Sequence, residues 1–167
     1  MRFIGVALVA SAVVLGACGG GEKKEEAAAA PAAAPAAAAS AAAPAAAGTA
    51  APITGTTFEV KMIGDEKGYR YEPAEIKAKT GDGIKFIMVT GGPHNVAFDP
   101  AKIPADVKGQ LDANFGADKM AELSSGLKMN PGETFLLSLG GIKAGTYEFN
   151  CTPHLAMNMK GKIIVVQ

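Results

Sequence analysis

Alternating apolar and polar positions dominate the chain from residue 53 onward and predict β-strands. Phe58, Val60 and Met62 alternate with Glu59 and Lys61. Further strands are predicted where this two-residue period or a short apolar run recurs, at Ile76 with Ala78, at residues 84–89, at Phe135 with Leu137 and Leu139, at Tyr147 with Phe149, and at residues 163–166. Turns rich in glycine and proline separate these runs, so the pattern predicts an all-β sandwich.

The segment 104–128 has a different apolar period. Gly109 and Gly116 lie within it and weaken a single long helix. We therefore expect one or two short helical turns, inserted between strands and packed over one side of the sandwich. The turn sequence Asn130-Pro131-Gly132-Glu133 then precedes the next strand. The apolar residues with helix-like spacing are Val107, Leu111, Phe115, Met120, Leu123 and Leu127.

The beginning of the chain has the features of an export signal. Arg2 is followed by an apolar run that ends at Leu15. This run is too short to span a bilayer and has the length of a signal-peptide apolar region. Leu15-Gly16-Ala17-Cys18 resembles a bacterial lipobox, which predicts a lipoprotein signal peptide over residues 1–17 and lipidation of Cys18. The alternative is an ordinary cleaved signal, with no role for the cysteine.

Residues 18–52 have the composition of a linker. Positions 27–51 are nearly all alanine, and proline recurs through the stretch as far as residue 52. Alanine favours helix, but proline interrupts it and restricts the preceding residue. We expect a disordered tether that can extend roughly 100 Å, either as a functional leash or as a spacer of unselected length. The folded domain is then residues 53–167.

Charge and cysteine content narrow the classes of function. The net charge is 0 and lysines and arginines do not cluster, so no nucleic-acid partner is expected. The two cysteines are Cys18 and Cys151, and a disulfide between them is conceivable by count. If Cys18 is lipidated, Cys151 is a single free thiol in an exported protein, which points to a metal or a reactive role.

Four potential metal ligands fall in a suggestive pattern. Cys151, His154 and Met159 form a Cys-x2-His-x4-Met motif after an aromatic strand, and His94 is the only other histidine. Two imidazoles, a thiolate and a thioether are the ligands of blue-copper sites, and they suit Cu(I) while still holding Cu(II). Zinc would also bind such donors, although structural zinc sites usually have more Cys or His. A Cys/His nucleophile is less well supported, since no orienting group or oxyanion-hole motif accompanies the pair.

The domain resembles plastocyanins and pseudoazurins, which belong to the cupredoxin family. The resemblance rests on residues 92–99 (GPHNVAFD), residues 131–134 (PGET) and residues 145–161 (GTYEFNCTPHLAMNMKG). It implies an eight-stranded Greek-key β-sandwich and one-electron transfer through a single type 1 copper ion. The resemblance assigns His94, Cys151 and His154 as trigonal ligands and Met159 as the axial ligand. It also implies that Asn95 ties the two ligand loops together.

Two details of the resemblance concern the ligand loop. Met157 competes with Met159 for the axial role, because some relatives have a shorter spacing between His and Met. If Met159 is the ligand, Met157 lies on the loop surface. The family's docking face would then surround His154 and consist of Pro93, Pro153, Leu155, Ala156 and Met157.

The resemblance implies a non-enzymatic electron carrier. Asn150 stands where plant and cyanobacterial plastocyanins have a tyrosine that serves a second electron route, so His154 is the expected exit. Copper oxidases and nitrite reductases need further histidines, and both histidines are already used. The alternative function is a copper chaperone or storage domain. The expected partners are redox proteins, such as a cytochrome or a membrane oxidoreductase complex. The protein itself is expected to be a monomer, anchored to a bacterial membrane on its periplasmic or outer face.

Overall fold

The computed structural model describes residues 48–167. The predicted signal peptide (1–17), the lipidation site Cys18 and the linker up to residue 47 lie outside these residues. Within residues 48–167, no helix has the length and apolar character needed to cross a bilayer.

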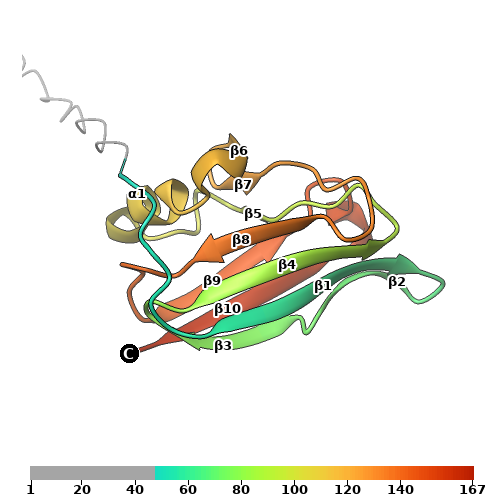
Figure 1. The fold of residues 1–167 in the computed structure, drawn as a ribbon. Helices are drawn as coiled ribbons and strands as arrows, with labels where there is room; N and C mark the ends of the chain where they lie inside the picture. Colours follow the sequence, from blue (N-terminus) through green and yellow to red (C-terminus); the bar gives the residue numbers. More distant parts are fainter. Residues whose placement is uncertain (1–47) are drawn as a thin grey trace, which may run out of the picture. The chain divides into compact units, whose positions relative to one another are not determined.

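Two β-sheets face each other and form a sandwich (Figure 1). The four-stranded sheet has the order β2 (Gly68–Glu72), β1 (Thr57–Asp65), β4 (Gly83–Thr90) and β8 (Thr134–Ser138). The six-stranded sheet has the order β3 (Glu75–Lys79), β10 (Lys160–Val166), β9 (Gly145–Asn150), β5 (Ala97–Phe98), β7 (Ser124–Ser125) and β6 (Lys119–Ala121). This architecture confirms the predicted β-sandwich of the cupredoxin type with a short helical insertion.

The core lies between the two sheets and is built from the apolar positions that the alternation predicted. Val60 and Met62 of β1 and Leu137 of β8 are fully buried. At the centre, the ring of Phe86 meets that of Phe149 edge to face, with centroids 5.4 Å apart. Alternation predicts this core well because strand side chains point in turn to opposite faces of a sheet.

Strand β2 is the main strand that the apolar pattern did not predict. In its sequence, Gly-Tyr-Arg-Tyr-Glu, Tyr69 and Tyr71 point to the same side, but Tyr71 is the only buried residue. The strand lies at the edge of its sheet, paired only with β1. An edge strand needs few apolar residues, so the only sequence pattern that indicates β2 is its two aromatic side chains.

The insertion begins as predicted and then differs. Helix α1 (Ala105–Ala113) buries Val107 and Leu111, and a short 3₁₀ turn η1 (Gly116–Asp118) follows. Residues 119–125 then form the small strands β6 and β7, and Met120 is 59% exposed, so the helical spacing was misleading there. Leu123 turns the chain at φ 53°, and its N–H donates to Asp112 Oδ1 (2.7 Å). The carboxylate of Asp112 on α1 thus stabilises a tight turn at Leu123, where a continuous helix is not possible.

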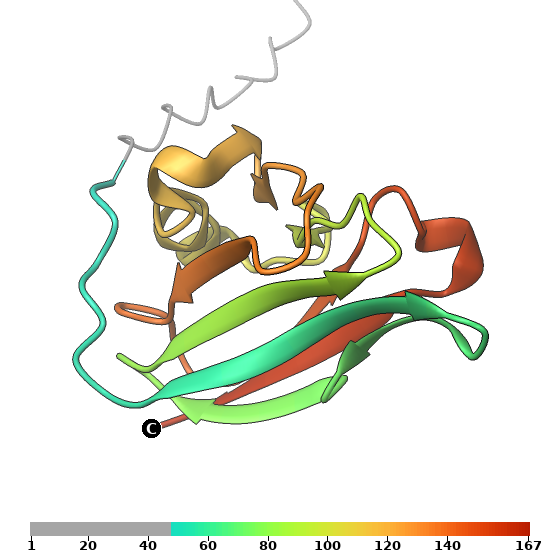
Figure 2. The ribbon, with the colours of Figure 1, turned by 45° about the vertical axis from the view of Figure 1, so that its right-hand side comes forward.

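The entering chain and the loop after β9 lie at opposite ends of the sandwich. Strands β1 and β4 run parallel, pairing Thr57 with Gly83 at their starts and Met62 with Met88 near their far ends. The N–H of Thr54 donates to Gly81 O (2.8 Å), which holds the entering chain at the first end. In both views the start of β1 is on the left, and the loop after β9 is on the right (Figures 1 and 2). The eight residues of β4 separate these ends by roughly 26 Å.

Candidate metal centre

Two strands from opposite sheets deliver the predicted ligands to one end of the sandwich. His94 follows β4, and Cys151 directly follows β9. Cys151 Sγ lies 3.7 Å from His94 Nδ1 and 3.4 Å from His154 Nδ1, and the two Nδ1 atoms are 3.2 Å apart. All three side chains are buried. The structure therefore brings three of the four predicted ligands together in a nearly equilateral triangle of donor atoms.

The size of this triangle fits a metal ion. The point that lies in the plane of the three donor atoms and is equidistant from them is about 2.0 Å from each, close to a metal–imidazole bond length. One sulfur and two nitrogen donors are the set that copper electron-transfer sites use. The residues present thus fit a single copper ion held by Cys151, His94 and His154.

The first ligand, His94, is fixed from both its ring and its backbone. Its Nε2 lies 2.9 Å from Thr90 O, and a carbonyl can only accept, so Nε2 carries the proton and Nδ1 is left free for a metal. The backbone of His94 pairs in both directions with that of Lys128 (3.0 and 2.7 Å). Lys128 Nζ in turn binds Asp118 Oδ1 at 2.6 Å. The end of the insertion therefore holds the first ligand loop.

The second ligand loop closes on itself. The N–H of Cys151 donates to Met159 O (3.1 Å), and the N–H groups of Met159 and Met157 both donate to His154 O (3.2 and 3.0 Å). A 3₁₀ turn, η2 (Leu155–Met157), ends at Asn158, whose φ of 61° is tolerated by asparagine better than by most residues. These bonds return the chain to the start of the loop and place Met159 beside Cys151.

The two candidate axial methionines have opposite environments. Met159 is fully buried, whereas Met157 lies on η2 and is 56% exposed. A thioether that binds the same ion as three buried donors must itself be buried. Burial therefore favours Met159, and its role as axial ligand stays a prediction.

Asn95 joins the two ligand loops. Its Oδ1 accepts from the N–H of Thr152 (2.7 Å), and its Nδ2 donates to Thr152 Oγ1 and Ser124 Oγ (3.2 Å each). Asn95 is 1% exposed, so its amide has little water to replace these partners. A single side chain thus ties the loop after β4 to the residue beside Cys151 and to strand β7.

Two tyrosines of β2 contribute to the site and were missed by the sequence reasoning. The hydroxyl of Tyr71 donates to Asn95 O (2.6 Å) inside the core. The ring of Tyr69 stacks on that of His154, with centroids 3.8 Å apart and planes 18° apart. The two tyrosines are two residues apart, which is the period of a strand and could have indicated β2. Nothing in the sequence, however, indicates that β2 lies beside the ligands.

Burial sets the protonation of the ligands in the metal-free site. Desolvation raises the pKa of the Cys151 thiol, and it lowers the pKa values of His94 and His154, the latter also through the neighbouring His94. The imidazoles are therefore neutral and ready to bind a cation. The thiol proton must leave when the sulfur becomes a metal ligand.

The predicted docking residues surround this end of the domain. Pro153, Leu155, Ala156 and Met157 are exposed and Pro93 is half-buried. His154 itself is 6% exposed. The residue directly after the insertion adds a further exposed apolar side chain that the sequence did not indicate. Met129 is 57% exposed, and its carbonyl oxygen would lie 3.3 Å from a Cβ at Gly92.

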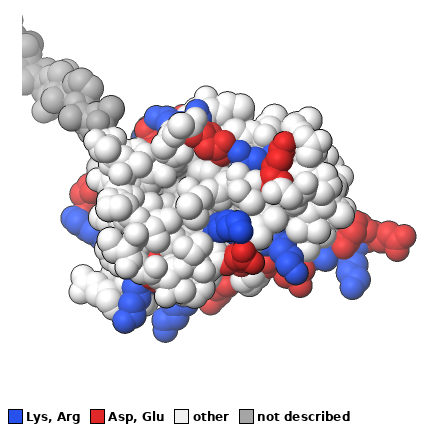
Figure 3. Space-filling view, in the orientation of Figure 1, with Lys and Arg blue, Asp and Glu red and all other residues white. Residues whose placement is uncertain are grey.

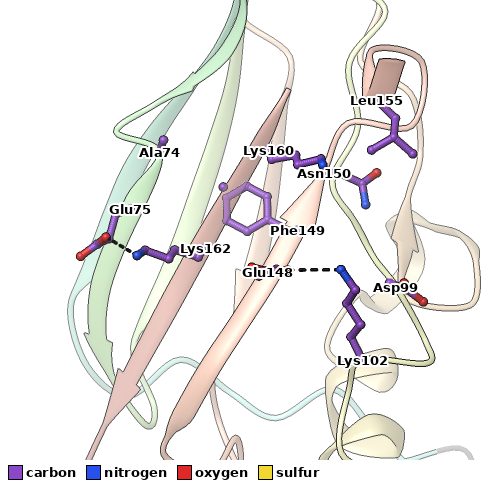
Figure 4. Close-up of a pocket in the computed structure, with 11 residues that line it drawn as sticks. Ala74, Glu75, Asp99, Lys102, Glu148, Phe149, Asn150, Leu155, Lys160 and Lys162 are labelled. Carbon is purple, nitrogen blue, oxygen red and sulfur yellow. Dashed lines mark hydrogen bonds and ion pairs between the residues drawn. The ribbon is translucent and has the colours of Figure 1, made fainter. Parts of the chain in front are cut away.

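A groove of about 550 Å³ lies on the flank of the site, over the outer face of β9 and β10 (Figure 4). Asn150 and Leu155 line its upper part. Four of its charged residues form ion pairs, Lys162 with Glu75 at 2.8 Å and Lys102 with Glu148 at 3.4 Å. The other two, Lys160 and Asp99, are of opposite sign. Figure 3 likewise shows basic and acidic residues interspersed over the face seen in Figure 1. Neither surface has the charge of one sign that would select a strongly charged partner.

Comparisons with known proteins agree with this geometry. Residues 58–166 match the family model described as copper binding proteins, plastocyanin/azurin family. The chain is 37% identical over 117 residues to plastocyanin of Prochlorothrix hollandica, covering 70% of this chain and 79% of that protein. It is 34% identical to plastocyanin of Rumex obtusifolius, covering 64% and 98%. A mutant fern plastocyanin structure matches with a TM-score of 0.50 and 34% identity, covering 65% and 100%.

The link made by Asn95 can be tested in the metal-free domain. Asn95→Ala removes the acceptor of the Thr152 N–H and the donor to two hydroxyls, so we expect the free energy of unfolding to fall by about 2 kcal/mol. Thr152→Val removes only one of these bonds and should cost less than about 1 kcal/mol. Urea unfolding monitored by circular dichroism measures both. Equal losses for the two variants would contradict the role given to Asn95.

The axial assignment can be tested by paired substitutions. Met159→Leu nearly conserves volume, so we expect the fold to persist at a cost below about 1.5 kcal/mol, while the visible spectrum and reduction potential of the copper-loaded protein change. Met157→Leu, at the exposed position, should leave both unchanged. Absorption spectra and cyclic voltammetry provide the measurements. A response confined to Met157→Leu would assign the axial role to that residue instead.

Proposed function

The chain belongs to the plastocyanin/azurin family of copper-binding proteins, and from this premise we propose that it is a non-enzymatic one-electron carrier. The observation that carries the proposal is the buried triangle of Cys151, His94 and His154 donor atoms, 3.2 to 3.7 Å apart. A copper ion bound there supplies a one-electron couple between Cu(I) and Cu(II).

The residues around the triangle suit electron transfer because they fix the positions of the donor atoms. His94 is held by Thr90 O, and the two loops are joined by Asn95. Burial of all three ligands keeps water out of the site. Donors that are already held in place by their neighbours need little reorganisation when the charge at the site changes by one.

We propose that electrons enter and leave at His154. The surface around it is apolar, with Leu155 47% and Met157 56% exposed. A small apolar patch supports close and short-lived contact, as a shuttle requires. The flank beside Asn150 offers a groove lined by equal numbers of acidic and basic residues, and position 150 has no aromatic ring, which supports His154 as the single route.

The alternative function is a copper chaperone or storage domain. Delivery of copper favours an open site with exchangeable ligands, whereas these ligands are buried and held by hydrogen bonds from neighbouring residues. An enzymatic role as a copper oxidase or nitrite reductase would need further histidines, and both histidines of the chain belong to this site. The observations therefore favour retention of copper and electron transfer.

We further propose that Cys18 is lipidated and that the domain is exported and tethered to a bacterial membrane, on its periplasmic or outer face. The chain enters the domain at the end opposite the ligand loops (Figures 1 and 2). A tether attached there leaves the surface around His154 free for redox partners. We propose that these partners are proteins such as a cytochrome or a membrane oxidoreductase complex, and that the carrier is a monomer that binds no nucleic acid.

The copper function is tested by titrating the metal-free protein with Cu(II). We expect one equivalent to bind and to produce an intense visible charge-transfer band, which Cys151→Ser should abolish because the sulfur donor is lost. Absorption and electron paramagnetic resonance spectra measure both effects. Met157→Leu serves as a control that leaves the buried donors intact. A colourless protein, or a band unaffected by Cys151→Ser, would refute the proposed site.

The anchor is tested separately in bacterial cells. Cys18→Ala removes the thiol that would carry the lipid, so we expect the protein to move from the membrane fraction to the soluble exported fraction. Cell fractionation with immunoblotting measures this, and Ser40→Ala in the linker is the control. Full membrane retention of Cys18→Ala would show that something other than this cysteine holds the protein.

A further inference from the structure

The two histidine ligands are held in place by different means. The His94 ring has a second anchor, because its Nε2 donates to Thr90 O at 2.9 Å. The outer nitrogen of His154 has no hydrogen-bond partner among residues 48–167. What contacts the His154 ring instead is the face of Tyr69, stacked with centroids 3.8 Å apart and planes 18° apart. The ring plane of His154 therefore depends on an aromatic contact.

The position of Tyr69 is built into the fold. Tyr69 lies on β2 of the four-stranded sheet, whereas His154 lies in the loop after β9 of the other sheet. Opposite Tyr69 on β1 is Gly64, where an added Cβ would approach Tyr69 Cε1 to 2.6 Å. The absence of a side chain at residue 64 makes the space in which the ring lies. The same ring also meets His94 edge to face at 6.1 Å.

We propose that Tyr69 is a positioning residue for the copper ligand His154, and that its stacked face favours the oxidised state of the site. This inference rests on the proposed function. An imidazole bound to Cu(II) carries more positive charge than one bound to Cu(I). The face of an aromatic ring is electron-rich and attracts positive charge. Tyr69 thus stabilises the oxidised form more than the reduced form and holds the same ring plane in both.

The contact also extends the route by which a partner reaches the site. Tyr69 is half-buried and its hydroxyl has no hydrogen-bond partner within the described part of the chain. We therefore expect a partner that docks at His154 to contact the Tyr69 ring as well. The ring, and not the hydroxyl, is the functional part, so phenylalanine should replace tyrosine without loss.

The first test uses the metal-free protein. In the wild type, nuclear magnetic resonance should show the His154 ring protons shifted upfield by the Tyr69 ring and should show cross-peaks between the two rings. Tyr69→Phe should retain the upfield shift and Tyr69→Leu should remove it. Arg70→Ala, which breaks the neighbouring ion pair with Asp65 (2.7 Å), controls for general weakening of the hairpin and should leave the shift unchanged. Absence of the shift and cross-peaks in the wild type would overturn the proposal whether or not the variants fold.

The second test uses the copper-loaded protein. At a fixed potential, Tyr69→Leu should lower the ratio of oxidised to reduced protein by about twofold to tenfold, the range expected for one aromatic contact, and should slow electron self-exchange. Tyr69→Phe and Arg70→Ala should match the wild type in both. An unchanged ratio and rate in Tyr69→Leu would overturn the proposal. If the wild type itself bound no copper, the proposed function would fail, while the metal-free spectra would still decide whether Tyr69 positions His154.

Discussion

The link between the His94 loop and the Cys151 loop is the constraint on which the site depends. The two loops are 57 residues apart in the chain and leave opposite sheets, yet their donor atoms must lie within 3.7 Å of each other. Neutral imidazoles and a protonated thiol have no strong attraction that would gather them without a metal. The amide of Asn95 supplies the connection, since it bonds to the backbone and the hydroxyl of Thr152. Because this amide is buried, its bonds do not compete with water.

Separate sets of hydrogen bonds hold the His94 loop and the Cys151 loop. Tyr71 reaches from β2 to the carbonyl of Asn95, and Lys128 pairs with the backbone of His94 from the far end of the insertion. The ligand loop after β9 closes through its own backbone bonds between Cys151, His154 and Met159. Rigidity at one end of the sandwich thus comes from both sheets and from the insertion. This explains how a small domain can hold donor atoms in place ahead of any metal.

The insertion 104–128 shows where the apolar period is an incomplete guide. Val107 and Leu111 fall on the buried face of α1, as helical spacing predicts. Beyond the helix the same spacing fails, because Asp112 binds the backbone of Leu123 and the chain turns back as β6 and β7. This return is what delivers Lys128 to His94. A hydrogen bond between a side chain and a distant N–H, such as that between Asp112 and Leu123, does not produce a periodic pattern of apolar residues, so the sequence could not reveal it.

By itself, the sequence determined the β-sandwich, the inward faces of its main strands and the three residues, His94, Cys151 and His154, whose donor atoms the structure brings together. Strand alternation is a local property, and a chain with two histidines offers few ways to build a site with Cys151. The tertiary structure decided how the pieces meet. It placed Met159 in the interior and Met157 at the surface, although both occur in the same short loop. It also brought Tyr69, from an edge strand with little apolar signal, onto the ring of His154. Such contacts join residues far apart in the chain, and only the packing of the two sheets brings them together.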